Sequence, residues 1–381
     1  MFNKRQCLQM IAAVMAAALL IAGCGGGAAT ADSQNQAAKI GVVSFLTGGG
    51  AAYGEAIRQG LELARDEINA QGKVKIELIF EDSKGEKNEA INAVNKLVNK
   101  DNVVGIVGPT LSGEMFAAGP IANQAGVVVF GTSITAEGAT DIGEYVFRNS
   151  LPESLAIPHA VKKAHQKYNL KRVAMMYSNN NDWAVSGYKS LDKAAKELGL
   201  EVVAIETFAD KDTDYSAQMT KIAALKPDAV MVSGLYQEAA LILKKARELG
   251  IDVPFVGSNG FNSPQLAKIA GKAADGAIVA SPWFAAKEDA GVQKFVEKFK
   301  AKYNGKVPDQ FSAQSYDALY IIASALEKSG SMSDRKKLRD SLAAIKDFTG
   351  VTGKFSFDEK RNPVMDATVL VVKDGQFTEL K

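Results

Sequence analysis

Small hydroxyl side chains follow two apolar runs in the N-terminal part of the chain. Ser112 lies in GPTLSG after NVVGIV, and Ser133 and Thr135 lie in GTSIT after VVVF. If both runs are parallel strands, their carboxyl ends meet at one edge of a sheet, where hydroxyls and main-chain N–H groups suit a carboxylate. The alternative is that Ser112 only caps a helix and that Ser133 and Thr135 are turn residues.

Aromatic residues recur near the same predicted edge. Tyr53 follows the glycine-rich loop TGGGAA, which lacks the third glycine of a dinucleotide-binding loop and the G-K-[ST] of a P-loop. This loop would let a ligand approach the backbone beneath Tyr53. Other aromatic residues at predicted strand ends or lobe junctions could wall an apolar pocket, although each alone could equally be packing: Trp183, Tyr236, Trp283, Phe284 and Phe311.

Residues that could perform catalysis are scarce. The two histidines, His159 and His165, fall on different faces of one predicted helix, so they do not form a metal pair. Two S-x-x-K matches lack companion motifs, and no G-x-S-x-G, H-E-x-x-H or paired-cysteine motif is present. A surface hydrolase is therefore disfavoured, and we expect no enzyme, no catalytic residue, no metal and no cofactor.

The N-terminus has the pattern of an export signal. Lys4 and Arg5 precede an apolar run from Leu8 to Ala22, which is shorter than the roughly 20 residues of a membrane-spanning helix. LIAGC resembles the bacterial lipobox, in which the cysteine is acylated after cleavage. We therefore expect a signal peptide over 1–23, a lipidated Cys24 with a flexible tether over 24–38, and an extracytoplasmic protein anchored to a membrane by its lipid. A retained anchor helix is the alternative.

Composition sets broad limits on size and partners. The chain has 381 residues, 47% hydrophobic and 23% charged, which suggests two globular domains. Its 45 basic and 43 acidic residues give a net charge of +2, so no field of one sign favours nucleic acid.

Short β-branched runs alternate with helical patterns in two successive series. The first series has predicted strands at 39–46, 74–82, 102–109 and 126–133, and helices at 53–69, 86–99 and 112–124. The second has predicted strands at 171–178, 201–208, 228–234, 254–258 and 276–281. Strands that are apolar almost throughout, each followed by a helix, favour parallel sheets covered on both faces.

The last hundred residues break this alternation. Three helical patterns, at 290–303, 310–328 and 334–345, precede short predicted strands at 354–357 and 367–373. They must complete lobes already begun, so the fold class is α/β with two Rossmann-like lobes joined by three crossover segments. We expect lobe 1 to hold 39–150 and 284–350, and lobe 2 to hold 151–283 and 351–381.

From Lys39 onward the sequence resembles the periplasmic leucine/isoleucine/valine-binding protein family, the type I solute-binding proteins of branched-chain amino-acid ABC transporters. The resemblance rests on four segments: KIGVVSFLTGGGAAYGEAIRQGLELARDEINAQG, GIVGPTLSG, GVVVFGTSITAEGAT and QFSAQSYDALYII. It implies an importer's binding lipoprotein that closes its lobes around a branched-chain or other neutral amino acid. The implied partners are this ligand and the permease and ATPase subunits, with the protein itself a monomer.

The resemblance also implies a ligand-binding set. The family's residues for the ligand's carboxylate and ammonium match Ser112, Ser133, Ile134 and Thr135, and three aromatic positions match Tyr53, Trp183 and Phe311. The expected tyrosine of the second lobe is shifted to Tyr236.

One position departs from the family pattern. Asn259 stands where the family commonly carries an acid for the ammonium. Either another acid such as Asp182 reaches the ligand, or the ligand lacks an α-ammonium. One alternative is therefore a binding protein of the same fold whose ligand is an amide, a urea-like compound or an aromatic carboxylate. Another is a detached ligand sensor.

Overall fold

The computed structural model describes residues 36–381. The predicted signal peptide, Cys24 and most of the predicted tether lie outside the described residues. Strand β1 (Ala38–Ser44) begins at residue 38, which is the last residue of the expected tether, 24–38. No helix within 36–381 combines the length and apolarity that a membrane crossing would need.

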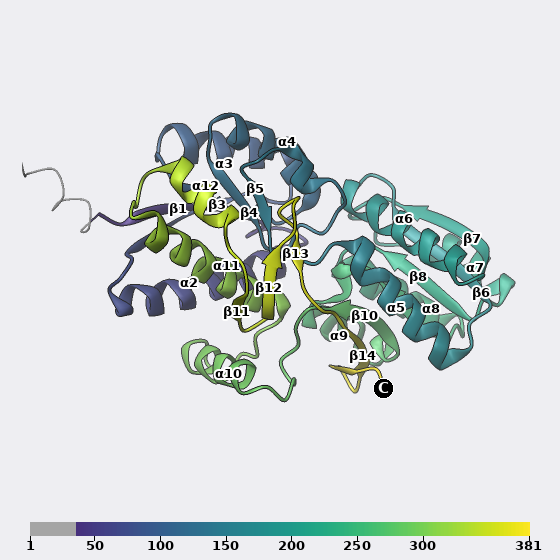
Figure 1. Ribbon diagram of the computed structural model, residues 1–381. Coiled ribbons are helices and arrows are strands. Elements are labelled where there is room, and N and C mark those ends of the chain that lie inside the picture. The colour runs from purple at the N-terminus through teal and green to yellow at the C-terminus, as the bar shows by residue number, and fades with distance from the viewer. Residues whose placement is uncertain (1–35) are drawn as a thin grey trace, which may run out of the picture. The chain divides into compact units, whose positions relative to one another are not determined.

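The first sheet has five parallel strands in the order β2-β1-β3-β4-β5 (Figure 1). Its other strands are β2 (Ile76–Asp82), β3 (Gly105–Val107), β4 (Val128–Gly131) and β5 (Val146–Arg148). The helices that connect them are α2 (Ala51–Gln71), α3 (Lys87–Asn99) and α4 (Ser112–Gln124), and a short turn, η1 (Ala139–Ile142), precedes β5.

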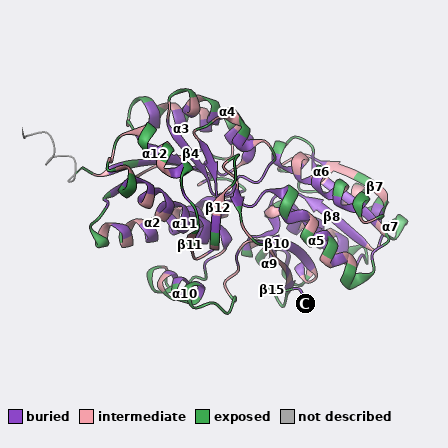
Figure 2. Cartoon of the chain, viewed as in Figure 1, coloured by how far each residue is buried: buried purple, intermediate pink, exposed green. Residues whose placement is uncertain are grey.

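Both faces of the first sheet are buried. Val128 and Phe130 of β4 belong to the apolar cluster that includes α2, whereas Val129 between them belongs to the cluster of α3 and α4. This alternation explains why the strands appear in the sequence as almost continuous apolar runs. Figure 2 shows the strands buried and the outer faces of the helices exposed.

The second sheet has seven strands in the order β15-β14-β10-β9-β8-β6-β7. Its parallel part comprises β6 (Arg172–Ser178), β7 (Glu201–Phe208), β8 (Ala229–Ser233), β9 (Phe255–Gly257) and β10 (Ala277–Ser281). The elements between these strands are α5 (Glu153–Tyr168), α6 (Asp182–Glu197), α7 (Ser216–Leu225), α8 (Tyr236–Glu248), η2 (Asn259–Phe261), α9 (Pro264–Ala270) and η3 (Gly271–Ala274). Met175 and Met231 face the cluster of α5 and α6, whereas Met176 and Val232 face that of α7 to α9.

The chain crosses between the two sheets three times within the described residues. After β5 it enters the second sheet, and after β10 it returns as α10 (Ala290–Lys302), α11 (Gln310–Ser329) and α12 (Arg335–Ala343), of which α11 packs along α2. The last crossing leads to β14 (Thr368–Lys373) and β15 (Gln376–Glu379). These two strands differ from the rest of the sheet, because β14 runs antiparallel to β10 and β15 antiparallel to β14.

A small antiparallel sheet, absent from the sequence prediction except for one strand, lies before the last crossing. It consists of β11 (Phe348–Gly350), β12 (Gly353–Phe357) and β13 (Pro363–Val364). Phe357 contacts Phe130 and Phe147 of the first sheet, at 6.1 and 5.4 Å between ring centroids. Residues 351–381 therefore divide their contacts between the sheets, and the exact limits of the two lobes stay a prediction.

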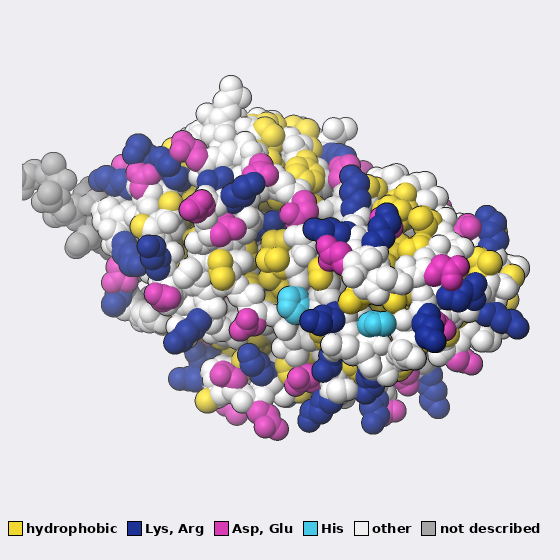
Figure 3. All heavy atoms as spheres, turned by 45° about the vertical axis from the view of Figure 1, so that its right-hand side comes forward, with side chains coloured by type: hydrophobic (Ala, Val, Ile, Leu, Met, Phe, Trp, Pro, Cys, Tyr) yellow, Lys and Arg dark blue, Asp and Glu magenta, His cyan; other side chains and the backbone are white. Residues whose placement is uncertain are grey.

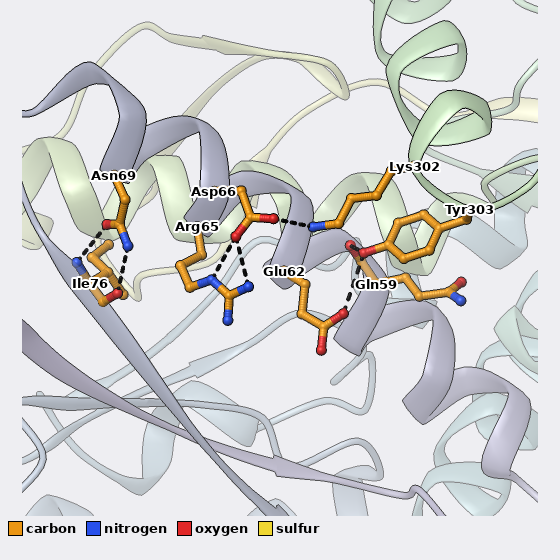
Figure 4. Close-up of polar contacts among 8 residues, drawn as sticks. All are labelled: Gln59, Glu62, Arg65, Asp66, Asn69, Ile76, Lys302 and Tyr303. Atoms are coloured by element: carbon orange, nitrogen blue, oxygen red, sulfur yellow. Dashed lines mark hydrogen bonds and ion pairs between the residues drawn. The ribbon is translucent and has the colours of Figure 1, made fainter.

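Polar contacts hold α10 against the outer side of α2 (Figure 4). Lys302 Nζ lies 2.5 Å from a carboxylate oxygen of Asp66, and the Tyr303 hydroxyl donates to the carbonyl of Gln59 at 2.8 Å. The Asn69 side chain bonds both backbone groups of Ile76, at 3.0 and 2.8 Å, and so ties α2 to β2. These contacts fix α2, whose first turn carries Tyr53.

Candidate functional site

A small cavity lies between the two lobes, at the carboxyl ends of the parallel strands. Its volume is about 20 Å³, which is close to the space of one water-sized sphere. The first lobe, together with helix α11, contributes Tyr53, Thr110, Leu111, Ser112, Ser133 and Phe311. The second lobe contributes Trp183, Leu235, Asn259 and Gly260. Six of the nine predicted ligand-binding residues thus meet here, although Thr110, Leu111, Leu235 and Gly260 were not predicted.

Tyr53 connects the two lobes. Its hydroxyl donates to the carbonyl of Gly260 at 2.8 Å and accepts from the backbone N–H of Tyr236 at 2.9 Å. Its ring lies 4.8 Å from that of Tyr236 and 4.9 Å from that of Phe311, edge to face. Burial raises the pKa of Tyr53 well above its usual value, so the hydroxyl stays protonated and able to donate. Tyr236 thus adjoins the cavity through Tyr53 rather than lining it.

The two predicted serines place hydroxyls at the cavity from neighbouring strand ends. The Ser133 hydroxyl donates to the carbonyl of Thr110 at 2.6 Å, and the Ser112 hydroxyl accepts from the backbone N–H of Ala136 at 3.3 Å. The alternative role of Ser112, as the cap of a helix, is not observed. The helix begins at Ser112 itself after Leu111, and the backbone N–H of Leu111 is bonded by the carboxylate of Glu114 at 2.9 Å.

Ile134 lies next to the cavity but points its side chain elsewhere. The side chain is fully buried in the cluster of α3 and α4, so only its main chain can face a ligand. Its carbonyl accepts from the Ser150 hydroxyl at 2.6 Å and from the Arg148 guanidinium at 3.0 Å. Arg148 also donates to the carbonyl of Ala136 at 2.8 Å, so it holds the segment that carries Thr135.

Glu153, an acid that the sequence analysis did not single out, accepts hydrogen bonds from Thr135, Trp183 and Asn259. The indole N–H of Trp183 lies 2.7 Å from the Thr135 hydroxyl and 2.9 Å from Glu153 Oε1. The same oxygen accepts from the Thr135 hydroxyl at 3.2 Å and from the backbone N–H of Asn259 at 3.1 Å. Glu153 has no exposed surface, and burial raises its pKa to about 7. In sequence it resembles an ordinary glutamate in the first turn of a helix, which gave no signal of this role.

Two side chains considered for ammonium binding are engaged elsewhere. The side-chain oxygen of Asn259 accepts from Gln310 at 2.6 Å and from Asn262 at 3.0 Å. Asp182 is half exposed and pairs with Lys87 across the mouth between the lobes, at 2.6 Å. The suggestion that Asp182 reaches the ligand is therefore not supported by its position.

The remaining chemistry-bearing residues lie apart from the cavity. The ring Nδ1 of His159 lies 2.7 Å from the carbonyl of Leu155, and that of His165 lies 2.9 Å from the carbonyl of Leu170. Figure 3 shows the histidines as separate spots on one face, among interspersed basic and acidic side chains. Among residues 36–381, no three histidine, cysteine or acidic side chains are grouped so that they could hold a metal ion.

Comparison with known proteins agrees with this arrangement. The family model described as "Periplasmic binding protein" matches residues 37–376. The chain belongs to this family. A curated relative of this periplasmic binding protein is the "Leucine-, isoleucine-, valine-, threonine-, and alanine-binding protein" of Pseudomonas aeruginosa. It is 29% identical over 371 residues, which cover 96% of this chain and 97% of the relative.

Solved structures share the fold of this periplasmic binding protein. LivJ of Streptococcus pneumoniae, a branched-chain amino-acid transporter substrate-binding protein in complex with isoleucine, has a TM-score of 0.84 and 35% identity, over 90% of this chain and 98% of that one. A solute-binding protein of an ABC transporter from R. palustris, in complex with benzoate, has a TM-score of 0.82 and 26% identity, over 91% and 96%.

These findings confirm several predictions. The resemblance to the leucine/isoleucine/valine-binding type and the two-lobed type I fold are confirmed. The relatives are binding proteins rather than enzymes, and the family is periplasmic, so this periplasmic binding protein is not an enzyme and is extracytoplasmic.

Proposed function

We propose that this protein captures a neutral amino acid, with branched-chain amino acids foremost, and delivers it to the permease and ATPase subunits of an ABC importer. The observation that carries the proposal is the interlobe cavity, where Ser112 and Ser133 of one lobe face Trp183 and Asn259 of the other. Ser112 begins helix α4 and Ser133 follows strand β4, so their hydroxyls and the main-chain N–H groups near them suit the ligand's carboxylate. Leu111, Leu235 and Phe311 supply apolar walls for its side chain.

Capture occurs by lobe closure, and the protein acts as a monomer. The bonds from Tyr53 to Gly260 and from Trp183 to Thr135 join the lobes directly, which supports a closed state in which the cavity is sealed. When the lobes close on a ligand, its carboxylate loses water, and its hydrogen bonds to fixed donors become stronger in the lower dielectric.

The protein is anchored to the membrane through a lipid on Cys24. The support is the sequence LIAGC at the end of an apolar run, since these residues lie outside the described part of the chain. Cells fed a labelled fatty acid should label the wild-type protein but not Cys24→Ser. Equal labelling of both would contradict the anchor.

A second candidate, an aromatic carboxylate as the ligand, is favoured by the neutral Asn259 and the aromatic rings around the cavity. A relative of the same fold has been solved with benzoate. A ligand panel separates the two candidates. Protein unfolded and refolded to remove ligand should be stabilised by leucine, isoleucine or valine, by about 2.7 kcal/mol at 100 times Kd. Stabilisation by benzoate but by no amino acid would favour the second candidate.

The hydroxyls can be tested directly. Ser112→Ala combined with Ser133→Ala should weaken amino-acid binding by about 100-fold or more, because each hydrogen bond to a charged group contributes about 1.5–3 kcal/mol. Calorimetry measures the loss, and Ser154→Ala, an exposed serine on α5, is the matched control. Unchanged affinity in the double variant would contradict the proposed position of the carboxylate.

A further inference from the structure

Only one of the two carboxyl oxygens of Glu153 has hydrogen-bond partners. Oε1 accepts three hydrogen bonds, from the side chains of Thr135 and Trp183 and from the backbone N–H of Asn259. Oε2 is buried and has no hydrogen-bond partner. A buried carboxylate oxygen without a partner is unfavourable, because burial removes the water that would otherwise solvate it. The orphaned oxygen therefore indicates that a donor is missing.

The charged groups around Glu153 do not provide this donor. Arg148 is near enough to be influenced by Glu153, but its guanidinium donates to the carbonyls of Ile134 and Ala136 and to the side chain of Asn362. Glu137, the other charged neighbour, has the same sign as Glu153. A further cation could therefore bind beside the Glu153 carboxylate.

Glu153 also lies where a ligand would meet both lobes. It starts α5, which packs on α6 and β10 of the second lobe, and there it touches Trp183 and Asn259, two residues that line the cavity. Thr135 approaches from the first lobe. The carbonyl of Thr135 also accepts from the backbone N–H of Glu153 at 2.9 Å, so Glu153 lies at the junction of the two lobes.

We propose that Glu153 recognises the ammonium group of the ligand, in place of an acid at position 259. This inference rests on the proposed amino-acid function. The ammonium carries three donors and fits between the Thr135 hydroxyl and the two oxygens of Glu153, while the carboxylate lies at Ser112 and Ser133. Glu153 thereby selects amino acids over acids that lack the ammonium, because these leave its charge unpaired in a buried site.

Paired ligands test this selection. Calorimetry would compare wild type and Glu153→Gln with leucine and with 4-methylpentanoate, which lacks the ammonium. Glu153→Gln should weaken leucine binding by about 100-fold, as expected when one partner of a buried charge pair is removed. Binding of 4-methylpentanoate should stay within about threefold of wild type or improve. The double variant Glu153→Gln, Asn259→Asp should recover at least about tenfold of the leucine affinity, since it restores an acid on the same lobe.

Controls separate recognition from structural damage. Glu137→Gln removes the same charge at an exposed neighbouring position and should leave leucine binding within about threefold of wild type. Equal losses for both ligands in Glu153→Gln, or no loss for leucine, would overturn the inference. If wild type binds no amino acid at all, the proposed function fails before any variant is measured, so the two failures are distinguishable.

Discussion

At the scale of single residues, Glu153 makes ligand binding sensitive to pH. Burial raises the pKa of this carboxyl group to about 7 in the ligand-free protein, with nearby Glu137 adding to the rise and hydrogen bonds from Asn259, Thr135 and Trp183 opposing it. An ammonium bound beside it would favour the ionised form and lower the pKa again. Binding at a pH below about 7 must therefore release a proton.

The affinity for an amino acid should accordingly rise with pH and level off above about pH 7, with a slope approaching tenfold per unit below that value. Arg148 is a charged group close to Glu153, and burial lowers its pKa only to about 10, so its titration lies outside this window and does not mask the effect. Calorimetry at pH 5.5 and pH 8 measures the difference, and Glu153→Gln should show none. A wild-type affinity that is equal at both values would be incompatible with this account.

At the scale of secondary-structure elements, Glu67 on α2 joins three helices. Its carboxylate receives Lys298 of α10 at 2.7 Å and the hydroxyls of Tyr316 and Tyr320 of α11 at 2.8 and 3.0 Å. Burial alone would raise the pKa of Glu67, but these three donors together lower it below its usual value. The ionised form is thus stabilised by folding.

We expect Glu67→Ala to destabilise the protein by about 2 kcal/mol at pH 7, because it leaves three donors without their acceptor. Since the pKa is lowered in the folded state, this contribution is present above the usual glutamate pKa and is lost as pH falls through the folded-state value. Urea unfolding at pH 7 and pH 3 measures the difference. Lys73→Ala, which removes an exposed pair with Glu327, is the control and should cost at most about 0.5 kcal/mol. A Glu67→Ala loss no larger than the control's would refute the role.

The elements themselves were largely predictable from sequence, for a physical reason. Strands such as β1 and β4 are buried on both faces, so their apolar runs stand out, and α4 was predicted with its correct limits. The strand β5 was missed because three residues within EYVFRNS give no pattern. The sheet β11-β12-β13 depends on distant aromatic contacts such as Phe357 with Phe147, which no local pattern reveals.

The candidate site was less predictable than the fold. Ser112 and Ser133 could be found because hydroxyls at neighbouring parallel strand ends must converge. Glu153 could not, because its importance arises from contacts with Thr135, Trp183 and Asn259, which are remote in sequence. Gly260 was missed for a related reason: a side chain there would meet the Gly234 carbonyl at 2.2 Å and the Trp183 ring at 2.8 Å, and sequence cannot show that closeness.

At the scale of the whole molecule, two ion pairs bridge the mouth between the lobes. Lys87 of the first lobe lies 2.6 Å from Asp182 of the second, and Glu86 of the first lies 2.8 Å from Lys211 of the second. All four side chains are about half exposed or more, so each pair contributes little to folding stability and is screened by salt. We expect these ion pairs to affect the equilibrium between the open and closed arrangements of the lobes instead.

Reversing one charge should open the ligand-free protein. Asp182→Lys places like charges opposite each other and should increase the radius of gyration measured by X-ray scattering at low salt. Adding Lys87→Asp restores opposite charges and should return the radius to the wild-type value. The same scattering curve for the single variant and the wild type would show that the pairs have no part in closure.

The cavity of about 20 Å³ has a kinetic consequence. No amino acid fits in it without movement of the lobes, so each capture and each release must pass through an opening event. The observed association rate should therefore reach a plateau at high solute concentration, equal to the rate of opening, instead of growing without limit. A solute's residence time is then a property of the hinge, and a transporter that pulls the lobes apart determines the moment of delivery.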